Sequence, residues 1–346
     1  MAEWRRRLCV SSWSMGGIAL ECLGRIGHSS PIMKLIVRLI FCATFSLLNF
    51  HLDAGEFSIE KTKAGITVKY DGKLFTRYVI GQSNKPFLWP VIGPSGDEVT
   101  RAFPMEKREG ERHDHPHHRS VWFGHQGTAG FDTWHEPASG RRTNLGSTVH
   151  REFVTVKGGD TAVIVTRNDY VGGGKKLLAD ERTHVFRVEN GQRIIDVTIK
   201  FTAEHGDCKL SDQKDAGFSV RVATSMDVDS KKGGRVINSN GITDRAAWGK
   251  RAEWVDYHGP VNGKTVGVAI LNHPKSFRHP TPWHVRTYGL FTANPFGLRS
   301  LGQGKDSSLT LKKGQSLTLR HRVIFHLGAE KAAKIAEAYK AYAAEK

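Results

Sequence analysis

Histidines gather in one short part of this sequence. Seven of the 17 histidines fall between positions 113 and 150, and the string HDHPHHR is the densest part. In an extended chain, alternate side chains point to opposite sides. His115 and His117 would then share one side, with Asp114 and His118 on the other. Such a concentration of imidazoles indicates chemistry rather than packing.

Clustered imidazoles suit either transition-metal binding or acid–base catalysis near neutral pH. The spacing matches no standard zinc motif, such as HExxH or paired CxxC. Three interpretations therefore stay open. In the first, His115, His117 and His118 hold a divalent zinc, copper or iron ion. In the second, His115 and His118 are metal-free catalytic groups, with Asp114 orienting one imidazole by accepting its second N–H. In the third, the loop is structural or merely solvated.

Two further stretches carry groups that suit a sugar. Asp132 and Trp134 follow a glycine-rich turn. There the carboxylate would bind hydroxyls, and the indole would stack on the ring. Further on, His284 and Arg286 alternate with Val285, which puts both polar side chains on one face of a predicted strand. An arginine beside a histidine is a natural partner for a carboxylate or a developing oxyanion. We therefore expect these stretches and the histidine string to face one cavity.

The remaining candidates are more scattered. Glu181 precedes a predicted hairpin and is the best isolated carboxylate for a general base. Lys214, Arg221 and Asn294 are candidate substrate-binding residues near or within predicted strands. For the first two, a role as rim charges is an equal alternative.

The segments that must position these groups have the alternating pattern of β-strands. Asp-Gly and Asn-Gly dipeptides mark tight hairpins. The predicted hairpins and strands are 66–80, 153–166, 183–201, 217–228, 265–271, 284–292 and 316–327. Alternation with one polar face is typical of antiparallel sheets, and the last segment, 329–346, has helical spacing. The sequence therefore predicts an all-β fold, a large antiparallel β-sandwich with a C-terminal helix.

The first 54 residues have the features of an export signal and not of the fold. An apolar run over 35–50 follows Lys34, and Ala54 supplies a small residue for cleavage. Met33 precedes this run, so we predict that translation starts there and that the protein is exported to the periplasm or beyond the cell. Residues 55–346 then form one domain.

The chain is strongly basic, at +17, and six basic and three acidic residues in the first 54 leave +14 after cleavage. The remaining basic residues form no run longer than two and no nucleic-acid-binding signature, which argues against a nucleic-acid partner. No long apolar stretch follows residue 54, so no membrane span is expected in the mature chain. A small molecule or a glycan is the expected partner, and the oligomeric state is open.

Several strings resemble a known family. DHPHHR, the strand 217–221, WHVR at 283–286 and NPFG at 294–297 are similar to proteins labelled "methane oxygenase PmoA", the PmoA-like family. The resemblance implies an exported β-sandwich like the galactose-mutarotase supersandwich. The label also implies a copper- or iron-dependent oxygenase. The methane monooxygenase subunit of that name is a polytopic membrane protein, and this chain has no matching spans, so the label is not taken literally.

Three functions follow from these residues. The leading hypothesis is an exported carbohydrate-active enzyme that transfers protons on a sugar or keto-sugar, as an epimerase, mutarotase or lyase-hydratase does. The second is a copper or iron oxygenase that uses the clustered histidines. The third is a non-catalytic glycan-binding module.

Overall fold

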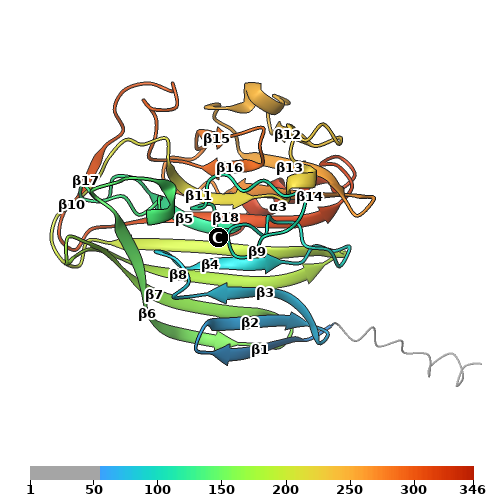
Figure 1. Cartoon of the computed structure of the whole chain (residues 1–346), viewed down its shortest axis with the longest axis horizontal. Coiled ribbons are helices and arrows are strands. Elements are labelled where there is room, and N and C mark those ends of the chain that lie inside the picture. Colours follow the sequence, from blue (N-terminus) through green and yellow to red (C-terminus); the bar gives the residue numbers. More distant parts are fainter. Residues whose placement is uncertain (1–54) are drawn as a thin grey trace, which may run out of the picture. The chain divides into compact units, whose positions relative to one another are not determined.

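The computed structural model describes residues 55–346, which form two eight-stranded antiparallel sheets (Figure 1). The predicted start at Met33, the export signal and the cleavage near Ala54 lie outside the described residues. No helix among the described residues is long and apolar enough to cross a membrane.

Each sheet is assembled mainly from neighbouring hairpins. The first sheet has the order β1 (Phe57–Thr62), β2 (Gly65–Tyr70), β3 (Lys73–Val79), β4 (Phe87–Val91), β5 (Val121–His125), β11 (Ala216–Arg221), β16 (Leu290–Ala293) and β15 (Trp283–Val285). The second has the order β12 (Arg235–Asn238), β13 (Trp254–Val261), β14 (Lys264–Asn272), β18 (Ser316–Leu327), β9 (Gln192–Thr202), β8 (Lys175–Glu189), β7 (Ala162–Gly172) and β6 (Gly146–Lys157). A small third sheet pairs β10 (Cys208–Leu210) with β17 (Leu309–Leu311).

The main hydrophobic core lies between the two large sheets. Phe75 and Phe218 of the first sheet and Ile195 and Phe201 of the second belong to one buried cluster. Each such side chain contributes about 1.5–3 kcal/mol by leaving water. The all-β sandwich prediction is therefore confirmed.

The predicted C-terminal helix is also present, as α3 (Ile335–Ala343). It begins later than the predicted position 329, after a series of turns. Its buried face, including Ile335 and Tyr339, packs on Trp254 and Ile324 of the second sheet. The helix therefore covers the face of that sheet opposite the main core.

The expected hairpin turns form where the dipeptides predicted them. Asp71 and Gly72 have φ of 50° and 70°, and Asn190 and Gly191 have φ of 50° and 74°. Two successive positive φ values match the twist of the flanking strands, and Gly and Asn tolerate them best. These turns join β2 to β3 and β8 to β9.

Two strand predictions need correction. The predicted strand 284–292 is two strands, β15 and β16, because the backbone turns between Arg286 and Gly289. The N–H of Gly289 donates to the carbonyl of Arg286 at 3.1 Å, and Gly289 has a φ of 101°. Arg286 therefore lies in the turn and not on a strand face with His284. The predicted strand 217–228 ends early, at Arg221.

A row of side chains crosses the first sheet on the face away from the main core. The strand register pairs Ser219 with Trp122 and with Thr292, and pairs Thr292 with His284. Their chain neighbours belong to the main core, so alternation directs this row outward. The outer face of β5, β11, β16 and β15 is thus the floor on which the site is built.

Candidate active site

A pocket of about 430 Å³ lies over this floor. It is lined by His115, His117, His118, His135, Ser139, Arg142, Lys214, Asp215, His284, Arg286, Tyr288 and Leu290. Side chains from the histidine string, from the loop before β11 and from the β15–β16 turn therefore meet at one hollow. Among the predicted site residues, the pocket brings together His115, His117, His118, His284, Arg286 and Lys214.

His118 is held in one tautomer by a buried arginine. Nη1 of Arg221 lies 3.0 Å from Nδ1 of His118. A guanidinium only donates, so Nδ1 must accept and the ring proton must be on Nε2. Burial first, and then the charge of Arg221, hold the pKa of His118 well below its usual range. The ring also stacks on Trp122, with centroids 5.3 Å apart. His118 therefore lines the pocket as a neutral ring that carries its proton on Nε2.

Asp114 organises the layer behind His118. Its Oδ1 accepts from Nη2 of Arg221 at 2.8 Å and from Nη1 of Arg101. Burial opposes its ionisation, but the facing ring of His115 and the two guanidiniums hold the pKa of Asp114 well below its usual range. Nδ1 of His115 lies 3.1 Å from Oδ2 without hydrogen-bond alignment. The carboxylate thus orients His118 through Arg221, a longer path than the direct contact that the sequence predicted.

His284 has the opposite tautomer. Its Nδ1 lies 2.9 Å from the carbonyl oxygen of Lys214, which only accepts, so Nδ1 carries the proton and Nε2 carries a lone pair. Burial lowers the pKa of His284 to about 4, against the opposing charge of Asp215. Asn294 fixes the carbonyl: its amide donates to the backbone oxygens of Gln213 and Lys214 at 2.9 and 3.0 Å. Asn294 was predicted to bind substrate, but it holds the loop that orients His284.

His135 is a site residue that the sequence analysis did not single out. Its Nδ1 lies 2.9 Å from Oδ2 of Asp132, whose Oδ1 accepts from the backbone N–H of His135 and of Trp134. The carboxylate fixes the proton on Nδ1 and leaves a lone pair on Nε2. Asp132 is 1% exposed, so it orients this imidazole and does not touch a ligand. The spacing Asp-x-x-His at 132–135 was the available signal.

A buried lysine fixes the segment that carries His135. Nζ of Lys85 donates to the carbonyl of Trp134 at 2.8 Å and to Oε1 of Glu136 at 3.0 Å. Burial lowers the pKa of Lys85 to about 8, although the charge of Glu136 opposes the shift. Arg119 pairs with the same carboxylate. These contacts attach the pocket wall to the chain before β4.

The other two imidazoles complete the wall. Nδ1 of His117 lies 2.9 Å from Oγ of Ser139 in the short 3-10 helix Pro137–Ser139. Burial, and then the neighbouring His135, keep the pKa of His117 low. His115 stacks on Tyr288 with centroids 4.8 Å apart. Tyr288, which the sequence analysis also missed, is the aromatic ring that lines the pocket.

Three predicted residues lie elsewhere. Glu181 belongs to β8 in the other sheet and pairs with Arg167 at 3.2 Å, so it cannot take a proton from a ligand in this pocket. Trp134 is 1% exposed and packs on Trp122 beneath the histidines, so it cannot stack on a bound ring. Arg221 is 1% exposed and acts through His118, not as a substrate-binding residue.

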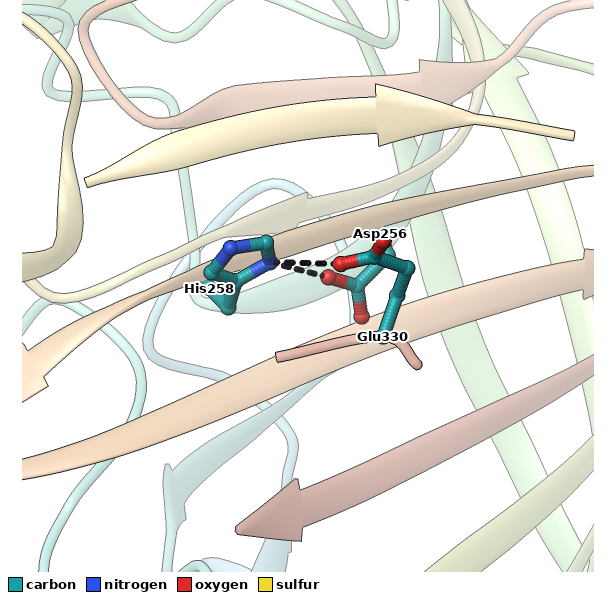
Figure 2. Close-up of side chains that lie close together, drawn as sticks. All are labelled: Asp256, His258 and Glu330. Carbon is teal, nitrogen blue, oxygen red and sulfur yellow. Dashed lines mark hydrogen bonds and ion pairs between the residues drawn. The ribbon is translucent and has the colours of Figure 1, made fainter. Parts of the chain in front are cut away.

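The predicted metal ligands His115, His117 and His118 line the same pocket, with ring centroids 4.5–5.7 Å apart. Among residues 55–346, the group whose possible ligand atoms lie within 4.8 Å of one another is Asp256, His258 and Glu330 (Figure 2); His115, His117 and His118 are not such a group. Nδ1 of His258 donates to Oδ1 of Asp256 at 2.6 Å, and Nε2 of His326 donates to Oδ2 at 2.6 Å.

This second cluster lies on the second sheet, and its ligand atoms are already in use. Both oxygens of Asp256 accept short hydrogen bonds, so a cation would have to displace a proton. Room for His326 comes from Gly267 on β14, where a Cβ would lie 2.1 Å from the ring. The cluster is therefore a hydrogen-bonded brace between β13 and β18 across β14.

Replacing the central carboxylate of this brace, Asp256→Asn, is expected to lower the free energy of unfolding by about 3 kcal/mol near pH 5.5, because it leaves buried imidazolium without a partner. Burial opposes the charge on His326, but Asp256 raises the pKa of this imidazole. Its stabilisation is present below about pH 6.5 and is lost as the pH rises through the raised pKa. His326 and His258 lower the pKa of Asp256. The contribution of Asp256 to the free energy of unfolding is therefore lost as the pH falls below about 4.

Urea unfolding at pH 5.5 and 8.5 checks this expectation. The difference between wild type and variant should be larger at pH 5.5. An equal difference at both pH values would show that His326 is not charged in the folded protein. Asp207→Asn, at an exposed ion pair with Lys312, is the matched control and should leave both curves nearly unchanged.

Comparison with known proteins identifies the family but no activity. A search of curated protein sequences found no match. A GH36 alpha-galactosidase from Geobacillus stearothermophilus, solved in complex with stachyose, is similar at 12% identity with a TM-score of 0.35. The alignment covers 78% of this chain and 40% of that one, so the chain spans less than half of that enzyme.

The family model that matches residues 65–340 is described as "Family of unknown function (DUF6807)". The sequence-based assignment to the PmoA-like family is therefore wrong, and the oxygenase function implied by that label has no support. The strings that carried the resemblance lie within the matched residues. The chain belongs to the family of unknown function DUF6807.

Proposed function

We propose that the protein is an acid–base enzyme that transfers protons on a sugar or keto-sugar, in the class of epimerases, mutarotases and lyase-hydratases. One observation carries the proposal: two neutral imidazoles of opposite tautomer line the same pocket. His118 offers a proton on Nε2, and His284 offers a lone pair on Nε2. The acceptor can take a proton from the ligand and return it, and the donor can stabilise the negative charge that the proton leaves behind.

The division of labour follows from these tautomers. His284 takes a proton from a hydroxyl or a carbon of the ligand and, as an imidazolium, returns it to a second ligand atom, while the Nε2–H of His118 donates a hydrogen bond to a ligand oxygen. Arg286 stabilises the negative charge that develops on oxygen between the two transfers. His135, also oriented as an acceptor by Asp132, is the alternative base. Each positioned acid or base of this kind is worth about 10²- to 10⁴-fold in rate.

The shape and lining of the pocket suit a small polar ligand. Its volume of about 430 Å³ falls in the usual range of small-molecule sites, about 300–1,000 Å³. The lining consists mostly of hydrogen-bonding side chains, and Tyr288 and Leu290 are its least polar members. A sugar matches this lining because it carries many hydroxyls and few apolar groups.

The test uses the purified full chain and a panel of aldoses and keto-glycosides. Proton NMR in deuterated water detects exchange at ring carbons, and polarimetry detects interconversion of anomers. Wild type should act on at least one panel sugar, and His284→Gln should lose that activity. His205→Gln, at a partly exposed ion pair with Asp169, is the matched control and should retain it.

Two outcomes would reject this proposal. One is sugar binding without proton exchange or turnover anywhere in the panel, which would leave the protein as a glycan-binding module. The other is full activity in a folded His284→Gln protein.

The activity should depend on pH in one direction. The pKa of His284 is lowered to about 4, so this base is neutral at all pH values well above 4. Turnover should therefore be nearly constant from about pH 6 to 8 and fall as the pH drops through about 4, because the protonated ring cannot accept a proton. A rate that instead falls about fourfold between pH 7.5 and 6 would indicate a base with an ordinary histidine pKa of about 6.5. Initial rates measured at constant ionic strength distinguish the two.

A further inference from the structure

The pocket has an excess of positive charge. Its lining contains Lys214, Arg142 and Arg286 but only one carboxylate, that of Asp215. Asp215 pairs with Lys214 at 2.9 Å. Arg142 reaches the buried Asp132 at 3.4 Å. Lys214 and Arg142 therefore have acidic partners, whereas Arg286 has no acidic partner among residues 55–346.

Arg286 is exposed and makes no ion pair or side-chain hydrogen bond within residues 55–346. Its guanidinium lies over the ring of Tyr288, 5.4 Å from the centroid. Its backbone N–H donates to the carbonyl of Leu290 at 2.7 Å, which fixes the turn. The side chain thus presents an unpaired guanidinium at the pocket. A planar guanidinium can bind a carboxylate through two parallel hydrogen bonds.

A neighbouring hollow extends the same surface. It has a volume of about 380 Å³, is lined by Arg245, Trp248 and Thr287, and shares Arg286 with the histidine pocket. Arg245 is exposed and has no ion pair among the described residues. An anionic group between the two hollows would therefore contact the guanidinium of Arg286 and lie near that of Arg245.

From this geometry we infer that the substrate is a sugar acid, a hexuronate unit whose carboxylate binds the guanidinium of Arg286 while its ring lies among the pocket histidines. The inference rests on the proposed function for the position of the ring. It adds a substrate class and names Arg286 as the residue that selects it. The net charge of +17 is consistent with a ligand that carries negative charge.

The carboxylate also gives the acid–base pair a specific proton to move. A C–H bond next to a carboxylate is acidified when a fixed cation binds that carboxylate, because the cation stabilises the negative charge left after the proton departs. In a hexuronate this is the C5 proton. His284 would take it, and exchange with solvent or return to the other face would replace it, so that no other reagent is needed.

Binding is measured by titration calorimetry of the full chain with glucuronate and galacturonate. Glucose and galactose are the neutral partners, and glucose 6-phosphate separates a carboxylate from a phosphate. We expect at least one uronate to bind about 10-fold or more tightly than its neutral partner and more tightly than the phosphate ester, with an affinity that falls as salt rises.

Arg286→Gln should then weaken uronate binding about 10- to 100-fold, the range of a lost charge-assisted pair, and leave neutral-sugar binding unchanged. Arg286→Lys keeps the positive charge but lacks the planar guanidinium. Its affinity for uronates should lie between those of wild type and Arg286→Gln. Arg299→Gln, at an exposed ion pair with Asp306, is the matched control and should bind like wild type. NMR in deuterated water should show deuterium at C5 of the bound uronate with wild type and with Arg299→Gln, but not with Arg286→Gln.

The outcomes separate this inference from the proposed function. Neutral sugars that bind as well as uronates, an Arg286→Gln protein that binds uronates like wild type, or tighter binding of the phosphate ester would each overturn the sugar-acid substrate. Exchange on neutral sugars alone would also overturn it while supporting the proposed function. Selective uronate binding without exchange or turnover of any sugar would reject the proposed function and leave the anion site in place.

Discussion

A His118→Gln protein should fold like the wild type and turn its sugar substrate over about 10²- to 10³-fold more slowly. His118 is 1% exposed and packs on Trp122, and glutamine fills a similar volume there. While its oxygen accepts from Arg221, the amide cannot place an N–H at the position of the imidazole Nε2, so the hydrogen bond to the developing negative charge is lost. The loss should therefore appear mainly in kcat and much less in KM, because binding contacts remain while this hydrogen bond to the transition state is gone.

The control for this variant comes from the same loop. His113 is exposed, stacks on Phe103 with centroids 4.8 Å apart, and is not a pocket residue. His113→Gln should retain wild-type turnover. Urea unfolding of both variants separates a chemical loss from an unfolded protein. Full turnover in a stably folded His118→Gln protein would show that the Nε2–H of His118 does not stabilise the developing negative charge.

Asp114→Asn should lower the free energy of unfolding by about 3 kcal/mol. The side chains of Arg101 and Arg221 are 0% and 1% exposed, and both depend on this carboxylate. Breaking a buried pair costs about 3–5 kcal/mol because a charge is left unpaired, and the partial exposure of Asp114 places this case at the lower end. Burial already lowers the pKa of Arg101 to about 9, so these two guanidiniums tolerate no further loss of negative charge.

Urea unfolding between pH 3 and 7 measures this effect. The pKa of Asp114 is lowered in the folded protein, so its contribution is present above about pH 4 and is lost as the pH falls. Wild type and variant should therefore converge toward acid pH. Glu106→Gln, at an exposed carboxylate on the same loop, is the control and should follow wild type. A difference that does not change with pH would point to altered packing in place of lost charge.

Most of the fold was predictable because its signals are local. Alternating side chains and Asp-Gly or Asn-Gly turns are readable from neighbours in the chain, and β2–β3 and β8–β9 formed as expected. The break between β15 and β16 was missed because the turn carries no Asn-Gly or Asp-Gly dipeptide to mark it. Only the positive φ of Gly289 distinguishes it, and many glycines in strands lack that feature.

The site was predictable in part. His115, His118, His284 and Arg286 were predicted to form one site, and they share one pocket. The signal for this prediction was the presence of histidines in mostly polar stretches. Trp134 was misplaced because burial depends on a layer supplied by distant residues, and nothing in its neighbours shows that the histidine loop covers it. The roles of the groups behind the pocket, including Asp132 and Asn294, depend on which atoms they meet across the fold, and residue type alone does not contain that information.

The bond between Nδ1 of His284 and the backbone carbonyl of Lys214 has an evolutionary consequence. A main-chain oxygen is common to all twenty amino acids, so mutation at position 214 can change the charge at the pocket mouth while the hydrogen bond that orients the base persists. Ligand preference can therefore diverge among descendants of this protein without first dismantling its proton acceptor. Position 214 is accordingly a good place to randomise when a new specificity is wanted.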